Sequence, residues 1–198
     1  TLSHTSGPAA PALREITLGQ LLAWAAQTTP ERLALIEGKA DAAARRQWSY
    51  AGLYRDALRT ARALRARFEP GERVAVWAPN LPEWVMLEFG CAMAGVVLVT
   101  VNPAFRASEV QYVLQQSRAA GVFVVESFRG NPMFDTAQQV APNCPGLREL
   151  IRFEQWDNFL AGGDAPGITL PTPQPGDAVM IQYTSGTTRE LPEAVKHS

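Results

Sequence analysis

The chain has 198 residues, of which 46% are hydrophobic and 19% are charged, and its formal net charge is -1. This length can bury a full core, and the apolar content together with the low net charge excludes an intrinsically disordered chain. The near-zero charge also argues against a nucleic-acid partner, because neutralising phosphates requires a clustered excess of Lys and Arg.

The cysteines and the apolar runs indicate in which cell compartment the protein is expected. Cys91 and Cys144 lack the CxxC spacing of a zinc site, and two cysteines make no disulfide framework, which fits a cytoplasmic location. Residues 1–14 have neither the basic nor the apolar region of a signal peptide. The most apolar run, residues 85–101, is interrupted by a glutamate and two glycines, whereas a spanning helix needs ~20 mainly apolar residues. We therefore expect no integral membrane segment.

The first predicted elements are a helix and a hairpin. Thr17 and Gln20 have the spacing of a capping box, and apolar residues then recur at helical intervals. Residues 1–16 are expected to form a flexible amino-terminal segment. Residues 33–37 predict a short strand, and residues 47–48 are expected to pair back as the second arm of a hairpin.

A long amphipathic helix is predicted next, with Ser49 as its cap. Its inner stripe is apolar and consists of Tyr50, Leu53, Tyr54, Ala57, Leu58, Ala61, Leu64 and Phe68. Four arginines lie among these positions, and we interpret them as a solvated helix face rather than as an anion site. They are Arg55, Arg59, Arg62 and Arg65.

From residue 73 onward, the sequence alternates between strand and helix. The strands are predicted at residues 73–77, 96–100 and 122–125. The helices between them are expected to start at the caps Asn80 and Ser108 and to end at Gly95 and Gly121. Unbroken runs of valine indicate strands that are buried on both faces, as in parallel sheets. Two right-handed crossovers then give an α/β fold with a doubly wound, mainly parallel sheet flanked by helices.

The last part of the chain leads to the segment of greatest functional interest. Residues 132–141 predict a helix and residues 150–153 a fourth strand. The Pro- and Gly-rich residues 162–176 predict a connector that crosses the surface. Residues 178–183 predict a buried strand, and this strand runs directly into the sequence TSGTT.

The TSGTT segment has the composition of a phosphate-binding loop. It consists of Thr184, Ser185, Gly186, Thr187 and Thr188. Open α/β sheets bind ligands at the carboxyl ends of their strands, where this segment would lie. Gly186 permits a positive φ, and successive N–H groups in such a turn form a nest for phosphate oxygens. The spacing is not that of a Walker loop, and an ordinary polar turn is the alternative interpretation. The residues alone leave both interpretations open.

Other candidate site residues also have structural interpretations. Cys91 lies in an apolar helix without a nearby His, and we interpret it as a buried thiol rather than a nucleophile. Glu83 and Glu88 are interpreted as helix charges rather than as an acid/base pair. Asn102 and Pro103 follow a strand at the ligand edge, where lining the site and forming a turn are both open. The tryptophans are interpreted as scattered core packing rather than an aromatic cage; they are Trp24, Trp48, Trp77, Trp84 and Trp156.

YTSGTT after an apolar strand resembles the phosphate-binding loop of the adenylate-forming superfamily, which includes acyl-CoA synthetases, peptide-synthetase adenylation domains and firefly luciferase. Upstream segments are similar in order and spacing, namely Val74 through Asn80, Glu83 and Trp84, Ala94-Gly95, Asn102-Pro103, and Gln111 to Ser117. The sequence NPAFRASEVQYVLQQS is most similar to the fatty acyl-CoA synthetase branch. The resemblance implies that residues 17–188 are the amino-terminal part of the family's large domain.

The resemblance also implies a function. A carboxylic acid, preferably a fatty acid, would react with Mg-bound ATP to give an acyl-adenylate, and coenzyme A would then displace AMP. Thr184, Ser185, Gly186, Thr187 and Thr188 would bind the β- and γ-phosphates, and Thr187 or Thr188 would lie near Mg²⁺. Catalysis would depend mainly on electrostatic placement of the triphosphate.

The chain departs from the family pattern after Thr188. The family's loop continues as TSGTTG-x-PKG, whereas this chain has Arg189 and Glu190 at the glycine and Glu193 at the lysine. A carboxylate in place of an ammonium repels a triphosphate. We therefore interpret residues 189–198 as a divergent tail.

The family's adenine-binding, ribose-binding and Mg²⁺-binding segments, its acyl pocket and its catalytic lysine have no counterpart in the 198 residues. No catalytic residue is therefore assigned, and we expect this chain alone to be inactive. One alternative is a non-catalytic remnant or interaction domain that forms a homodimer through the surface that the rest of the domain would cover. The other is a ligase for an aromatic or other carboxylic acid.

Overall fold

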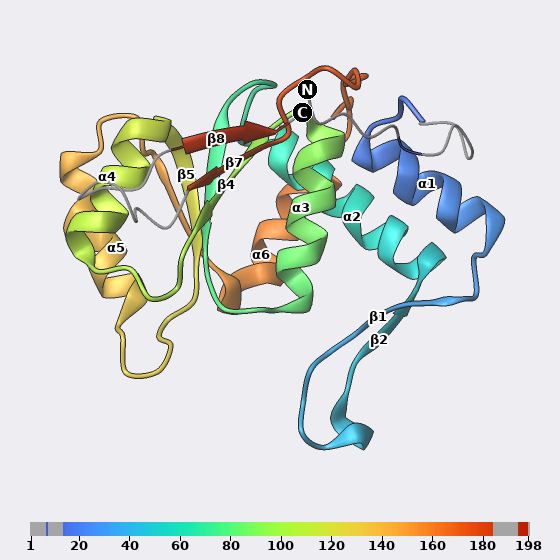
Figure 1. The fold of residues 1–198 in the computed structure, drawn as a ribbon, viewed down its shortest axis with the longest axis horizontal. Coiled ribbons are helices and arrows are strands. Elements are labelled where there is room, and N and C mark those ends of the chain that lie inside the picture. The colour runs from blue at the N-terminus through green and yellow to red at the C-terminus, as the bar shows by residue number, and fades with distance from the viewer. Residues whose placement is uncertain (1–6, 8–13, 184–193, 198) are drawn as a thin grey trace, which may run out of the picture.

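The structure is a computed structural model that describes residue 7, residues 14–183 and residues 194–197. Its centre is a six-stranded sheet in the order β6-β5-β3-β4-β7-β8 (Figure 1). The strands are β3 (Arg73–Trp77), β4 (Val97–Val101), β5 (Ala119–Val124), β6 (Glu149–Arg152), β7 (Met180–Tyr183) and β8 (Ala194–His197). Strands β3 to β7 are parallel, and β8 pairs antiparallel with β7. The predicted α/β fold with a doubly wound, mainly parallel sheet is confirmed.

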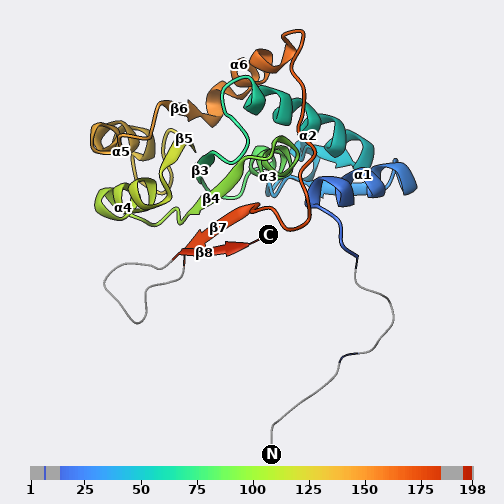
Figure 2. The same ribbon diagram turned by 90° about the horizontal axis from the view of Figure 1, so that it is seen from above.

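Helices cover both faces of this sheet (Figure 2). One face carries α1 (Leu18–Thr28), α2 (Tyr50–Arg65), α3 (Pro82–Ala94) and α6 (Trp156–Ala161). The other face carries α4 (Ala107–Ser117) and α5 (Met133–Val140). Short 3₁₀ turns occur at Ala42–Ala44, Ala141–Asn143, Phe153–Gln155 and Gly162–Asp164. Within the described residues, none of these helices combines the length and the apolar character needed to cross a bilayer.

The core lies on both sides of the three central strands. Val74, Val76, Val99, Val122 and Phe123 are all fully buried, since helices cover them from both faces. This burial explains why the sequences of these strands are unbroken apolar runs, without the alternation of apolar and polar residues that is typical of strands exposed on one face.

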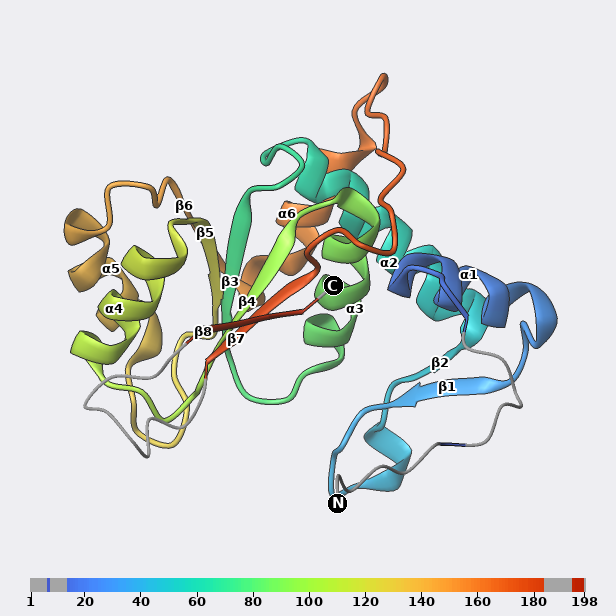
Figure 3. The same ribbon diagram turned by 45° about the horizontal axis from the view of Figure 1, so that its top comes forward.

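A two-stranded antiparallel hairpin projects away from the sheet, as Figure 3 shows. It consists of β1 (Leu33–Ile36) and β2 (Gln47–Ser49), as the sequence predicted.

Three predicted helix ends are confirmed. The Thr17 hydroxyl accepts the N–H of Gln20 at 3.2 Å, and the reciprocal bond completes a capping box. The Ser49 hydroxyl accepts the N–H of Gly52 at 3.2 Å and caps α2. Gly95 ends α3 with a φ of 68°, a conformation that favours glycine.

Three other predicted ends are wrong. The N-cap of α3 is Leu81 rather than Asn80, because Pro82 already occupies the first turn. Helix α4 begins after Arg106 rather than at Ser108, and the Glu109 carboxylate accepts the N–H of Arg106 at 2.8 Å.

Gly121 does not end α4. Arg118, with a φ of 52°, ends it, and Gly121 lies inside β5.

Two side-chain predictions are also wrong. Arg65 is not on a solvated face, because its side chain is only 16% exposed and donates to the Phe68 carbonyl and to Glu69. Trp24 is not in the core, because it is 47% exposed.

Candidate functional site

The carboxyl ends of β3 and β4 create a ligand-binding geometry. The chain leaves β3 toward α3 on one face and leaves β4 toward α4 on the other (Figure 1). Adjacent strands whose following loops diverge in this way form the switch point at which open α/β sheets bind ligands.

A cavity of about 500 Å³ lies at this switch point. It is lined by Ala78, Asn80, Trp84, Thr100, Val101, Asn102, Pro103, Phe105, Met180, Gln182 and Tyr183. None of these lining residues has a carboxylate or a cationic side chain, and amide and aromatic groups predominate. We call it the switch-point cavity.

Strand β7 ends at this cavity. It pairs in parallel with β4 through Leu98 with Met180 and Val99 with Ile181, so both strands end at the same edge. Its last residue, Tyr183, contributes to the cavity wall.

Contacts with α4 hold Tyr183 in place. The Tyr183 hydroxyl donates to the Val113 carbonyl at 3.4 Å, and its ring packs edge-on against Tyr112 with centroids 6.5 Å apart. Burial, with a smaller contribution from Tyr112, raises the pKa of Tyr183 to about 12. The phenol is therefore neutral at physiological pH.

The predicted phosphate-binding residues follow Tyr183 directly. Thr184, Ser185, Gly186, Thr187 and Thr188 lie outside the described residues, as do Arg189, Glu190 and Glu193. The flanking strands are described, and Tyr183 pairs with Ala194 across the β7–β8 ladder. The described chain therefore reaches the switch-point cavity at Tyr183, directly before the predicted residues.

The Asn102 turn has both of the roles that the sequence left open. The Asn102 carbonyl accepts the N–H of Phe105 at 3.0 Å, and its side-chain oxygen accepts the N–H of Ala104 at 2.9 Å. The Asn102 carbonyl also accepts the indole N–H of Trp77 at 3.1 Å. The same turn lines the cavity through Asn102, Pro103 and Phe105.

Sequence reasoning missed Asn80 and Gln182 as cavity residues and Trp77 as the donor to the turn. Asn80 follows β3 closely, so its place at a strand's carboxyl end was a usable signal. Gln182 is the one polar residue of β7, which was a second signal. Nothing local to Trp77 indicated its partner in another strand.

The other candidates do not gather at this edge. Glu83 pairs with Arg46 at 2.5 Å rather than with Glu88, and burial raises the pKa of Glu88. Cys91 is fully buried, and burial raises the pKa of its thiol, which fits a structural rather than a nucleophilic role. Among the described residues, no three His, Cys, Asp or Glu side chains are grouped to hold a metal ion.

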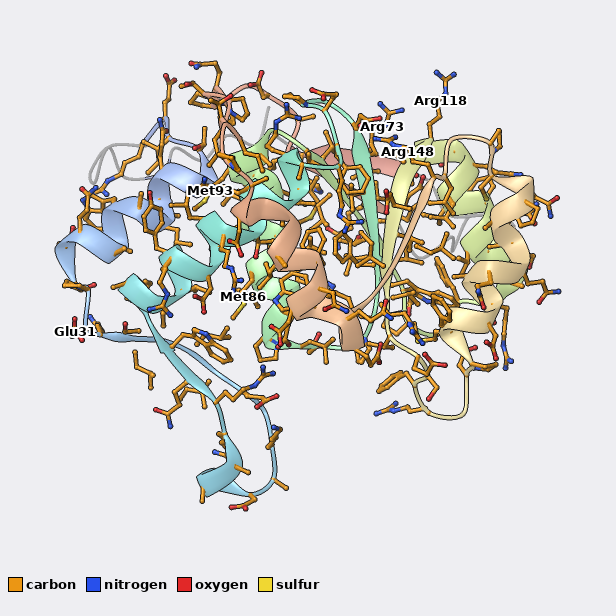
Figure 4. All side chains as sticks on the ribbon, turned by 180° about the vertical axis from the view of Figure 1, so that it is seen from behind. Glu31, Arg73, Met86, Met93, Arg118 and Arg148 are labelled. Atoms are coloured by element: carbon orange, nitrogen blue, oxygen red, sulfur yellow. The ribbon has the colours of Figure 1, made fainter. Side chains whose placement is uncertain are left out.

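The opposite edge of the sheet is basic, and two of its arginines make described contacts. Figure 4 shows Arg73, Arg118 and Arg148 near one end of the sheet. Arg73 donates to the Ser117 carbonyl at 2.9 Å, and Arg148 pairs with Glu72 at 2.6 Å. These contacts give Arg73 and Arg148 structural roles at the end of α4 and beside β3.

A larger cavity of about 530 Å³ lies at the same amino-terminal end of the sheet, beside Gly71, Gly95, Val97 and Pro171. Because α/β sheets bind substrates at the carboxyl edge, its size does not make it the better candidate site.

Fold and cavity together define an α/β protein of the class that binds its ligand at the carboxyl edge of a doubly wound sheet. The sequence profile of the AMP-binding enzyme family matches residues 22–190. The chain therefore belongs to this family and, with it, to the adenylate-forming superfamily.

Similar proteins agree with this assignment. The mitochondrial medium-chain acyl-CoA ligase ACSF2 of Mus musculus is 31% identical over 214 residues, which cover 94% of this chain and 34% of that protein. The Danio rerio counterpart is 30% identical and covers 95% and 35%. The chain thus spans about a third of the length of these curated relatives.

Solved structures match the fold over nearly the whole chain. The inhibitor-bound N-terminal domain of FACL13 from Mycobacterium tuberculosis is 26% identical with a TM-score of 0.72, over 93% of this chain and 44% of that chain. A long-chain-fatty-acid-CoA ligase from Archaeoglobus fulgidus gives a TM-score of 0.80 at 20% identity, over 99% and 39%. The second match shows the fold alone.

Proposed function

We propose that this chain supplies the triphosphate-binding part of an ATP-dependent ligase that joins a fatty acid to coenzyme A. The observation that carries the proposal is that β7 ends at the switch-point cavity and leads directly into TSGTT. Relatives named as acyl-CoA ligases support the reaction class.

In the proposed reaction, a carboxylate oxygen attacks the α-phosphorus of ATP, and the bond to the leaving pyrophosphate breaks. The coenzyme A thiolate then attacks the acyl carbon of the acyl-adenylate, and AMP leaves. Thr184, Ser185, Gly186, Thr187 and Thr188 would hold the β- and γ-phosphates through backbone N–H groups and hydroxyls. Strand β7, which is paired on both sides, would hold the amino-terminal end of this segment at the cavity.

Mg²⁺ fits the donors that the proposal assigns to it. Hydroxyl oxygens are hard ligands of the type that Mg²⁺ prefers, and the ion keeps several waters while it contacts substrate phosphates. Thr187 or Thr188 would therefore lie near the ion without a dedicated carboxylate cage. When bound, Mg²⁺ neutralises charge on the triphosphate.

The proposal is tested by calorimetric titration with Mg-ATP and by ATP–pyrophosphate exchange with a fatty acid. We expect the 198-residue chain to bind Mg-ATP but to show no exchange, because it spans about a third of the length of its relatives. The absence of binding would contradict the nucleotide site, and measurable exchange would contradict the proposed inactivity.

Glu193→Lys tests the charge of the loop. Glu193 stands where the family pattern has a lysine, and replacing a carboxylate by an ammonium turns repulsion of the triphosphate into attraction. We expect Glu193→Lys to tighten Mg-ATP binding severalfold in a calorimetric titration. Glu190→Lys is the matched control, since it makes the same charge change at a position for which the family has no lysine. An equal gain in Mg-ATP affinity in both variants would show that the gain comes from net charge alone and not from the position of residue 193.

A second candidate is a non-catalytic interaction domain that forms a homodimer. It is favoured by the departures at Arg189 and Glu193 and by large apolar side chains that are 41–47% exposed, namely Leu21, Trp24, Leu33 and Ile36. A concentration-dependent mass in light scattering that Trp24→Ser abolishes, together with no Mg-ATP binding, would favour this candidate over the ligase.

The proposed acid substrate is a fatty acid. An aromatic or other carboxylic acid is the alternative substrate, and thermal shifts with fatty and aromatic acids would separate the two.

A cytoplasmic location is supported by two free, buried cysteines, Cys91 and Cys144. A fluorescent fusion observed in the source cell would test the location.

A further inference from the structure

Trp77 makes a contact that packing alone does not explain. It is fully buried at the end of β3, yet its indole N–H reaches across to the Asn102 carbonyl at 3.1 Å, just beyond the end of β4. A buried indole N–H finds a partner because leaving it unpaired is costly. The partner here is a turn that lines the switch-point cavity.

The turn has two further hydrogen bonds of its own. Asn102 accepts the N–H groups of Ala104 and Phe105, which closes the turn locally. These bonds set the shape of the turn but do not attach it to the sheet. In addition, the Asn131 amide donates to the Phe105 carbonyl at 3.5 Å, a longer contact. The bond from Trp77 is therefore the short side-chain contact that joins this turn to the neighbouring strand.

We propose that Trp77 is a positioning residue for the nucleotide site: its bond to Asn102 holds the 102–105 turn as a rigid wall of the switch-point cavity. The inference rests on the proposed function. Trp77 itself does not line the cavity, so it acts through the turn. Freeing the turn would raise the entropic cost of ordering the wall when ligand binds.

Trp77→Phe tests this inference, because it keeps an aromatic ring and removes the N–H. Trp156→Phe is the matched control: Trp156 is 8% exposed, packs against Phe123, Phe153 and Phe159, and does not line the cavity. Both variants truncate a buried indole and both are expected to lower the melting temperature. Only Trp77→Phe should also weaken Mg-ATP binding, by roughly three- to tenfold as expected for one lost hydrogen bond.

Hydrogen exchange separates positioning from general destabilisation. The amides of Ala104 and Phe105 should exchange faster in Trp77→Phe than in Trp156→Phe. Asn102→Ala keeps the main-chain carbonyl that accepts from Trp77 and removes only the side-chain bond to Ala104, so it should speed exchange at Ala104 and leave the contact with Trp77 in place. Asn102→Asp keeps the oxygen that accepts from Ala104 and should restore the protection of that amide.

The outcomes are distinguishable. If the wild-type chain binds Mg-ATP and Trp77→Phe binds it as tightly as Trp156→Phe does, the positioning role is overturned while the proposed function stands. If the wild-type chain does not bind Mg-ATP, the proposed function fails, and the role that rests on it fails too. Unchanged exchange at Ala104 and Phe105 in Trp77→Phe also overturns the inference.

Discussion

Packing across the sheet determines which residue can occupy the position of Gly121. This glycine lies in β5, and a Cβ atom there would come within 2.6 Å of Cζ and 2.9 Å of Cε1 of Phe68. Phe68 follows α2 and is only 1% exposed, so its ring has little room to move. The absence of a side chain at residue 121 therefore lets the end of α2 dock onto the strand.

Gly121→Ala is expected to destabilise the fold by about 1–3 kcal/mol through overpacking. Urea unfolding measures the change, and Gly176→Ala is the control because nothing lies within 4 Å of the Cβ atom it would add. Phe68→Leu removes the atoms that clash. The double variant Gly121→Ala with Phe68→Leu should then lose less free energy of unfolding than the two single losses together. Additive losses would show that the ring is not the obstacle.

The prediction that Gly121 ends a helix is wrong for a physical reason. A glycine after an amphipathic segment is typical of a helix end, and local pattern contains no information about a ring in a distant segment. The helix end is instead at Arg118, which adopts a left-handed conformation without being glycine. At Gly95 the same rule succeeds, because there the backbone itself requires a positive φ.

Among the elements, the β1–β2 hairpin is joined to the rest of the molecule by one ion pair and one side-chain hydrogen bond. Arg46 pairs with Glu37 at 2.9 Å within the hairpin and with Glu83 at 2.5 Å at the start of α3. Beside this contact, the Trp48 indole donates to Asp56 of α2 at 3.0 Å. Hydrogen bonds from Arg46 and Lys39 lower the pKa of Glu37 to about 2.

The stability of the hairpin should fall at acid pH, because Glu37 pairs with Arg46 within it. A carboxyl whose pKa is lowered by folding contributes stability above its unfolded pKa, and the contribution is lost as pH falls through the folded pKa. For Glu37 this window runs from its ordinary value of 4.5 down to about 2. We expect amide exchange in β1 and β2 to accelerate on acidification across that window, relative to the rest of the chain.

Glu37→Gln provides the control for this pH dependence. The wild-type chain and Glu37→Gln should differ near neutral pH and converge toward pH 2, because protonation removes the charge that the variant lacks. Comparing the two curves removes the contribution of Glu72, whose pKa the bond to Arg148 also lowers. Parallel curves over the whole range would show that the ion pair does not hold the hairpin.

The elements that the sequence predicted are those with local signals. The cap of α1 is formed by Thr17 and Gln20, which are three positions apart. The cap of α2 is formed by Ser49 with Gly52, again three positions away. Helix α6 was not predicted, because its contacts are distant in sequence: Trp156 and Phe159 of this helix pack against Phe123 of β5. Strand β8 was not predicted either, because its pairing with β7 rather than its own pattern makes it a strand.

For the whole molecule, alternation of strand and helix gave the fold class but not the strand order. Strand β5 pairs with β3 rather than with β4, which it follows in sequence, and this reversal creates the switch point. The sequence placed Asn102 and the end of β7 at the carboxyl edge of the sheet, and both line the switch-point cavity. It could not assign Trp77 its role, because the partner of Trp77 depends on which strands become neighbours.

The sheet also predicts in which strand ligand binding should slow amide exchange. Strand β7 pairs with β4 at two positions and with β8 at four, and it is only half-buried, so its amide exchange reports local opening at the edge of the switch-point cavity. A ligand that binds only while β7 is in place slows its opening, by up to about 100-fold when present at 100 times its Kd. We therefore expect Mg-ATP to slow amide exchange in β7 and to leave β6 unchanged, while adenosine with Mg²⁺, which lacks phosphates, should protect neither. Equal protection of both strands by Mg-ATP would place binding elsewhere, because β7 lines the switch-point cavity and leads into the TSGTT segment, whereas β6 does neither.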